Sequence, residues 1–230
     1  MLENAIKLKN NTNKERQFDL IVWDWDGTVA NSTGMITNAI VKAAEQVGLP
    51  TLDPQAATNI IGLGLKESIH ALYGDIPNDK AQALAAQYTV NYYAGESEIP
   101  LFDGAKEMIV ELNRRGFKLA VATGKGRRGL NLALQNCGLG NYFHATRTVD
   151  ECFSKPHPQM LDELMDLLVV RPERTLMIGD TSYDLQMAQN AGVASIGVTF
   201  GAQAHDKLVS YNPLKIFNQF SDLSSWLLEQ

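Results

Sequence analysis

Strand-like and helix-like segments alternate along the second half of the chain, and this alternation constrains the fold more than any other feature. An apolar run at 18–23, rich in β-branched and aromatic residues, predicts one earlier strand. From residue 104 onward we expect, in chain order, a helix at 104–115, a strand at 117–122, a helix at 127–137, a short strand near 143–147, a helix at 158–168, a strand at 174–178, a helix at 182–191, strands at 194–199 and 215–217, and a helix at 221–228. Alternation of this kind is typical of a parallel sheet covered by helices on both faces. The sequence therefore predicts an α/β fold.

The connection between the first two predicted strands is much longer than a crossover requires. Thr28 and Lys118 lie about 90 residues apart, whereas a right-handed crossover needs a helix and roughly a dozen residues. Most of the intervening sequence has helical patterns, which indicates an inserted subdomain. We expect three parts: a polar leader at 1–17, an α/β core formed by 18–30 and 101–230, and a helical cap at 31–100 that sits over the acidic site described next.

Two acidic residues follow the first strand directly. Asp24 and Asp26 are two positions apart, so in an extended chain their side chains point the same way. Gly27 then allows a sharp turn at the carboxyl edge of the strand, where ligands of open α/β sheets bind. Two carboxylates at one site repel each other unless a cation or a shared proton relieves them. The pair predicts a metal site, a proton-transfer role, or both.

Further polar residues lie where they would converge on the same edge. Thr123 ends the second strand, and Asp180 ends the strand predicted at 174–178, with Asp184 one helical turn later. Lys155 lies between strands, held by the prolines at 156 and 158 just before a helix. Mg²⁺ binds through a few carboxylates together with substrate phosphate oxygens. This set of side chains predicts a divalent-metal phosphate site.

The motifs resemble those of a known enzyme superfamily. Asp24-x-Asp26-Gly27-Thr28, Thr123-Gly124, Lys155-Pro156 and Gly179-Asp180-x-x-x-Asp184 resemble, in order, the four motifs of the haloacid dehalogenase (HAD) superfamily. The resemblance implies a HAD-like Rossmannoid core, and the helical segment after the first motif is similar to that family's C1 cap. Gly62-Leu63-Gly64, Val121-Ala122-Thr123-Gly124-Lys125 and Lys155-Pro156-His157-Pro158 most resemble the phosphoglycolate phosphatase-like branch.

The resemblance also implies a role for each motif residue. Asp24 would be the nucleophile that forms an aspartyl-phosphate, and Asp26 would be the acid/base. Mg²⁺ would be held by Asp24, the backbone carbonyl of Asp26, and Asp180. Thr123 and Lys155 would bind the transferred phosphoryl group. Asp184 would not contact the phosphoryl group itself but would orient Lys155 or a metal-bound water.

The substrate stays open at this stage. Gly64, Lys66 and Gly124 are candidate substrate residues, although for Lys66 the pattern favours a solvated surface lysine somewhat over a substrate contact. We expect an Mg²⁺-dependent phosphomonoester hydrolase acting on a small phosphorylated metabolite, such as phosphoglycolate, a sugar phosphate, a nucleoside monophosphate or a damaged metabolite. The alternatives are a phosphomutase with the same nucleophile and a non-catalytic interaction module. Haloacid dehalogenation is disfavoured because that branch lacks the second acid supplied here by Asp26.

Composition limits the classes of partner and the cellular location that we expect for this protein. A formal net charge of −6 disfavours a general nucleic-acid or membrane-surface binder. No apolar run approaches the roughly 18 residues of a spanning helix, and the polar leader lacks a signal-peptide core. Cys137 and Cys152 have no zinc spacing and do not make a disulfide framework. We expect a cytoplasmic protein, monomeric or alternatively dimeric, with a small molecule as its partner.

Overall fold

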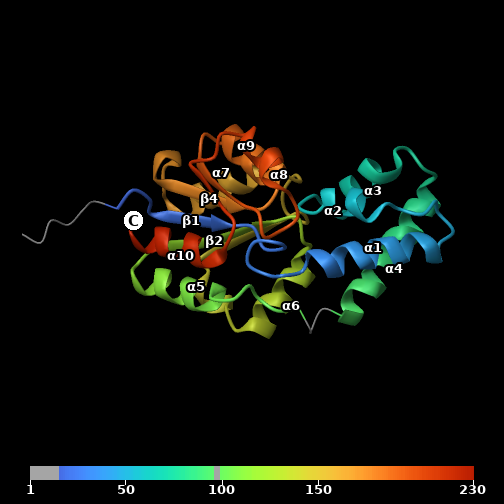
Figure 1. Ribbon diagram of the computed structural model, residues 1–230, viewed down its shortest axis with the longest axis horizontal. Helices are drawn as coiled ribbons and strands as arrows, with labels where there is room; N and C mark the ends of the chain where they lie inside the picture. The colour runs from blue at the N-terminus through green and yellow to red at the C-terminus, as the bar shows by residue number, and fades with distance from the viewer. Residues whose placement is uncertain (1–15, 96–98) are drawn as a thin grey trace, which may run out of the picture.

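The computed structural model describes residues 16–95 and 99–230, and its centre is a six-stranded sheet (Figure 1). The strands are β1 (Leu20–Trp23), β2 (Lys118–Thr123), β3 (Ala145–Thr148), β4 (Thr175–Gly179), β5 (Ala194–Val198) and β6 (Lys215–Phe217), in the spatial order β3-β2-β1-β4-β5-β6. Every neighbouring pair is parallel. The predicted α/β fold with a parallel sheet is confirmed.

The strand order reverses at β1, and this reversal places the site. From β1 the chain adds β2 and β3 on one side, and then adds β4, β5 and β6 on the other. The loops that follow β1, β2 and β4 therefore lie side by side at the carboxyl edge, with β1 in the middle. A crevice at such a switch point is where open α/β sheets bind ligands.

Helices cover both faces of the sheet because alternate strand residues are apolar on both sides. Ile21 and Trp23 share a buried cluster with α5 (Ala105–Arg114), α6 (Arg127–Cys137) and α10 (Phe220–Leu228). Leu20 and Val22 face the other way, toward α7 (Gln159–Leu168) and α8 (Ser182–Asn190). In Figure 1 the two helix layers lie below and above the sheet.

Four helices between β1 and β2 form a group of their own, to the right of the sheet in Figure 1. They are α1 (Thr33–Gln46), α2 (Pro54–Asn59), α3 (Leu65–Tyr73) and α4 (Asn78–Gly95), and we call residues 31–100 the helical insert. Ile40 of α1, Ile69 of α3 and Leu84 of α4 belong to one buried cluster separate from the clusters of the sheet. That the insert acts as a cap stays a prediction.

The observed elements begin and end close to their predicted bounds, with a few differences. β1 begins at Leu20 rather than at residue 18, and β3 begins at Ala145 rather than near residue 143. A short helix, α9 (His205–Val209), was not predicted, because a single buried residue, Leu208, is too little for a periodic pattern. Two short 3₁₀ helices, Gly140–Tyr142 and Pro172–Arg174, were also not predicted.

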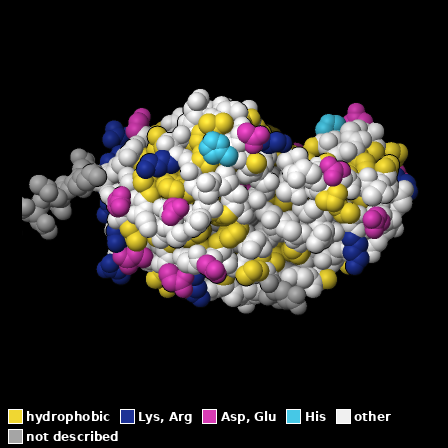
Figure 2. Space-filling view, viewed as in Figure 1, with side chains coloured by type: hydrophobic (Ala, Val, Ile, Leu, Met, Phe, Trp, Pro, Cys, Tyr) yellow, Lys and Arg dark blue, Asp and Glu magenta, His cyan; other side chains and the backbone are white. Residues whose placement is uncertain are grey.

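The predicted leader lies mostly outside the described residues, which begin at Arg16. The Arg16 guanidinium donates to the carbonyl oxygens of Arg115 and Gly116 at 3.1 Å each, so the chain is attached to the core before β1 starts. Over the described part of the chain, no helix combines the length and the apolar character needed to cross a membrane. Acidic and basic side chains are interspersed on the face seen in Figure 2.

Candidate active site

The turn after β1 brings Asp24 to the centre of the sheet edge. Asp24 is 1% exposed, and its backbone N–H continues the ladder by donating to the carbonyl of Ile178 on β4. Gly27 turns the chain with a φ of 84°, and a Cβ there would overlap the Asp180 carboxylate. Only glycine combines this backbone conformation with so close an approach. The DxDG sequence thus places the first strand end directly against the fourth.

Lys155 binds two of the buried carboxylates. Its Nζ lies 2.5 Å from Asp24 Oδ1 and 2.6 Å from Asp184 Oδ1, and all three side chains are essentially inaccessible to water. Burial alone lowers the pKa of a lysine, but the two carboxylates outweigh it and raise the pKa of Lys155 above its ordinary value. Lys155 is therefore a permanent cation that orients Asp24.

Both carboxylate oxygens of Asp184 accept hydrogen bonds from neighbouring groups. Its Oδ1 accepts from Lys155, while its Oδ2 accepts from the backbone N–H of Thr181 at 3.1 Å and from the Thr181 hydroxyl at 2.7 Å. The bond from the Thr181 N–H to the Asp184 carboxylate is part of a capping box at the start of α8. The helix cap thus fixes the carboxylate that positions the lysine.

Asp180 completes a cluster of three buried acids. Its Oδ1 accepts from the Thr28 hydroxyl at 3.0 Å, and its Oδ2 accepts from the Ala202 N–H at 2.6 Å. Burial, reinforced by the charge of Asp184, raises the pKa of Asp180 to about 7. Burial likewise raises the pKa of Asp24 well above its usual range, although the charge of Lys155 opposes the shift.

The three acids fit a divalent cation. One carboxylate oxygen from each of Asp24, Asp180 and Asp184 lies within 4.8 Å of the other two. Asp24 Oδ2 is buried and has no hydrogen-bond partner among the described residues. Three carboxylates face a single ammonium group there, so the cluster carries excess negative charge that a small hard cation would neutralise.

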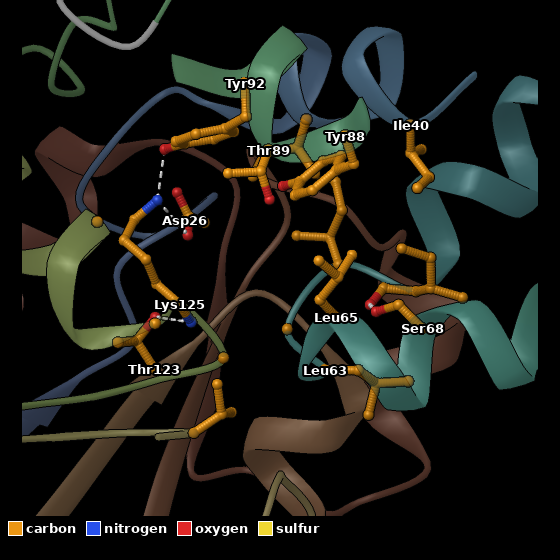
Figure 3. A pocket seen from close by; sticks show the side chains of 18 of the residues that line it. Asp26, Ile40, Leu63, Leu65, Ser68, Tyr88, Thr89, Tyr92, Thr123 and Lys125 are labelled. Atoms are coloured by element: carbon orange, nitrogen blue, oxygen red, sulfur yellow. Dashed lines mark hydrogen bonds and ion pairs between the residues drawn. The ribbon is translucent and has the colours of Figure 1, made fainter. Parts of the chain in front are cut away.

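Asp26 lies in the same cavity as Asp24, but its side chain has other partners. Its Oδ1 accepts from the Ser32 hydroxyl at 2.8 Å, and its Oδ2 lies 3.1 Å from Lys125 Nζ. Lys125 also donates to the Tyr92 hydroxyl at 2.5 Å, with its Nζ 4.4 Å from the centre of the Tyr92 ring. Figure 3 shows this chain of contacts running from Asp26 through Lys125 to α4 of the insert.

Sequence reasoning missed Ser32, Lys125 and Tyr92 as site residues. Lys125 had a visible signal, because it follows Thr123 by two positions in the same strand-to-helix turn, and its N–H donates to the Thr123 hydroxyl at 3.1 Å. Ser32 and Tyr92 lie on the insert, whose sequence gave no sign of which helix faces the strand ends. Lys125 and Tyr92 line, together with Asp24 and Asp26, a cavity with a volume of about 250 Å³.

The candidate substrate residues have different positions. Gly124 lines the cavity, and a Cβ on it would lie 2.5 Å from the carbonyl oxygen of Gly62 and 2.6 Å from that of Leu63. Gly64 is not part of the lining; its N–H donates to the Ser154 hydroxyl at 2.9 Å and so joins the insert to the loop before Lys155. Lys66 is exposed, and the structure does not bring it to the cavity.

Comparisons with known proteins identify the family of the chain. Residues 21–198 match the family model described as haloacid dehalogenase-like hydrolase. The chain is 32% identical to a probable phosphatase, IndB, of Dickeya dadantii, over 89% of this chain and 91% of that one. It is 25% identical to the pyrophosphatase PpaX of Bacillus mycoides, over 90% and 95% of the two chains.

A solved structure supports the same family. The crystal structure of a predicted phosphoglycolate phosphatase from Haemophilus somnus superposes with a TM-score of 0.82 at 25% identity, covering 93% of this chain and 99% of that one. The family model spans the strands that carry Asp24, Thr123 and Asp180. The chain belongs to the haloacid dehalogenase-like hydrolase family and is a phosphatase of that family.

Proposed function

We propose that the protein is an Mg²⁺-dependent phosphomonoester hydrolase that acts on a small phosphorylated metabolite through an aspartyl-phosphate. The observation that carries this proposal is the state of Asp24. One of its oxygens is held by Lys155, and the other has no hydrogen-bond partner among the described residues, at the strand-order switch and on the wall of a cavity. A fixed carboxylate with one unengaged oxygen is suited to attack phosphorus.

In the proposed reaction, Asp24 carries the phosphoryl group and Asp26 carries the protons. Asp24 forms a bond to phosphorus as the bond between phosphorus and the alcohol oxygen breaks, and Asp26 gives its proton to the departing alkoxide. Asp26 then takes a proton from water, whose oxygen attacks phosphorus and releases Asp24 and inorganic phosphate. Lys125 and Ser32 hold the Asp26 carboxylate toward the cavity during both proton transfers.

Cations around Asp24 let an anionic nucleophile meet an anionic phosphate. Asp24, the carbonyl of Asp26, and Asp180 are the groups we assign to Mg²⁺, which when bound would neutralise charge on the phosphate and on the carboxylate. Lys155 supplies a second, permanent positive charge, and Thr123 offers a hydroxyl to the phosphoryl oxygens. Asp184, with both oxygens already bonded, positions Lys155.

The helical insert is proposed to act as a cap over this site. Gly124 of the core touches the backbone of the insert at Gly62 and Leu63, and Tyr92 of the insert contacts Lys125. We expect these contacts to limit the access of water to Asp26, the proposed acid/base. Limited access of water favours proton transfer from Asp26 to the leaving group over side reactions. A cytoplasmic location is part of the proposal, supported by the two free cysteines, Cys137 and Cys152. A monomeric state is also part of it.

The test measures phosphate release from a panel of phosphomonoesters with Mg²⁺ present, together with isomer analysis of sugar phosphates. We expect inorganic phosphate and the free alcohol, no isomerised phosphate, and no turnover in Asp24→Asn, which keeps the shape of the side chain but removes its charge. Substantial activity in folded Asp24→Asn would refute the assigned nucleophile. Isomer formation without net phosphate release would instead identify a phosphomutase.

A further inference from the structure

The wall that the insert contributes to the cavity carries no charge among the described residues. Ile40 of α1, Leu63 of the α2–α3 connection, Leu65 of α3 and Tyr88 of α4 give it an aliphatic and aromatic surface (Figure 3). Its polar groups include the hydroxyls of Ser68 and Thr89. The charged residues of the lining all come from the core. The reacting phosphate and the rest of a substrate therefore meet different chemical environments.

The one cation in the described lining is already engaged. Lys125 lies 3.1 Å from Asp26 Oδ2 and 2.5 Å from the Tyr92 hydroxyl, and its side chain is 7% exposed. Lys155 is not part of the lining and is held between Asp24 and Asp184. Because the other charged lining residues, Asp24, Asp26 and Asp150, are acidic, a second anionic group on a substrate would find repulsion here rather than a counter-charge.

This arrangement of charged and apolar residues favours apolar leaving groups over charged ones. A carboxylate or a second phosphate placed against the insert would lose its hydration without a compensating charge, which is strongly unfavourable. An apolar ring would gain from burial and would pack against the ring of Tyr88. The volume of about 250 Å³ lies below the usual range for drug-sized ligands, so a single ring suits it.

We propose that the natural leaving group is an uncharged, largely apolar alcohol that carries one ring and binds between Tyr88 and Leu65. The inference rests on the proposed phosphomonoesterase activity and narrows its substrate class. The hydroxyls of Ser68 and Thr89 donate to the carbonyl oxygens of Ile60 and Ala85. Each can still accept a hydrogen bond from one neutral polar substituent on the ring. The names of two similar proteins, a pyrophosphatase and a predicted phosphoglycolate phosphatase, refer to substrates with charged leaving groups, so the proposed specificity differs from the one that those names imply.

The experiment compares kcat/KM for four esters of primary alcohols in two matched pairs, with Mg²⁺ present. Benzyl phosphate and glucose 6-phosphate both carry a six-membered ring but differ in polarity. Ethyl phosphate and phosphoglycolate have two carbons each but differ in charge. We expect benzyl phosphate to exceed glucose 6-phosphate by about tenfold or more, as burial of an apolar ring implies, and ethyl phosphate to exceed phosphoglycolate.

A pair of variants on α4 localises the effect. Tyr88→Ala should reduce the ratio of benzyl to ethyl phosphate kcat/KM about fivefold, through loss of ring packing. Val90→Ala, at a side chain 63% exposed on the same helix, should leave the ratio unchanged. Preference for phosphoglycolate or glucose 6-phosphate, or an unchanged ratio in folded Tyr88→Ala, overturns the leaving-group assignment alone. No hydrolysis of any of the four esters overturns the proposed function, and the assignment with it.

Discussion

A single buried lysine organises the acids of this site. Lys155 joins Asp24, from the first strand end, to Asp184, from the first turn of α8, with both distances close to 2.5 Å. Removing one partner of a buried ion pair typically costs about 3–5 kcal/mol, because the other charge is left uncompensated. The lysine therefore has a structural part in the site in addition to its proposed role in binding the phosphoryl group.

The contact between Lys125 and Tyr92 gives a prediction for one hydroxyl group. Tyr92→Phe keeps the ring over Lys125 but removes the acceptor, so Lys125 should hold Asp26 less firmly. We expect kcat/KM to fall about fivefold, the effect of losing one hydrogen bond of about 1 kcal/mol. Steady-state kinetics with ethyl phosphate measures it.

A second tyrosine of the insert supplies the control. The Tyr73 hydroxyl donates to the carbonyl of Pro50 at 2.8 Å, away from the cavity. Tyr73→Phe should lose a comparable amount of stability in urea and keep wild-type kcat/KM. Equal kinetic losses in the two variants would show that Tyr92 acts only through the stability of the insert.

At this scale the sequence predicted the residues at strand ends. Asp24, Thr123 and Asp180 were found because parallel strands end at one edge, so their neighbours in space follow from the pattern of strands. Tyr92 was not found, because its place depends on how a helix of the insert lies over the sheet. Lys66 was assigned to the substrate from its nearness to Gly64 in sequence, and the structure leaves its side chain in solvent.

Among the elements, the turn after β2 is where core and insert touch most closely. Gly124 does not have a positive φ, so alanine suits its backbone. A Cβ there would nevertheless lie 2.5–2.6 Å from two carbonyl oxygens of the insert. We expect Gly124→Ala to displace the insert and lower kcat/KM by at least about tenfold, since small misplacements around reacting groups are costly.

Gly34 in the first turn of α1 is the matched control for this substitution. A Cβ at Gly34 would meet no atom within 4 Å, so Gly34→Ala should keep full activity and stabilise the helix by up to about 1 kcal/mol. Thermal melts and kinetics of both variants test this pair. Wild-type kcat/KM in Gly124→Ala would mean that the contact with the insert does not matter for turnover.

The order and type of the larger elements were predicted well for a physical reason. Each sheet helix shows one apolar face and each inner strand a continuous apolar run, because parallel strands are buried on both sides. The short α9 has one buried side chain, Leu208, and follows a loop that places Ala202 against Asp180. A local pattern of residues cannot predict the hydrogen bond between Ala202 and Asp180, because the two residues are far apart in sequence.

For the molecule as a whole, metal binding should couple to folding. The three buried carboxylates repel one another in the free protein, so a cation that binds the folded state stabilises it. We expect Mg²⁺ at a hundred times its Kd to raise the free energy of unfolding by about 2.7 kcal/mol. The shift should be lost in Asp180→Asn and retained in Asp222→Asn, which changes an exposed acid on α10.

Urea unfolding with and without Mg²⁺ measures this coupling without any substrate. An Mg²⁺ response in Asp180→Asn equal to that of the wild type would remove Asp180 from the metal site.

For the whole molecule, the sequence predicted a second helical unit from the length of the first connection. The position of that unit over the strand ends was not predicted, because it depends on long-range contacts such as the hydrogen bond from the Gly64 N–H to the Ser154 hydroxyl.

Detection of a covalent phosphoryl group on Asp24 tests most directly whether this side chain is the nucleophile. Asp26→Asn should slow hydrolysis of the intermediate, because no base remains to activate water. Acetyl phosphate supplies a leaving group that needs no proton, so Asp24 can still be phosphorylated in this variant. After rapid quenching, borohydride reduction and peptide mass analysis, we expect one modified residue, Asp24, and no modification in the Asp24→Asn/Asp26→Asn double variant. Phosphorylation of a different residue, or turnover of acetyl phosphate by Asp24→Asn, would contradict this expectation.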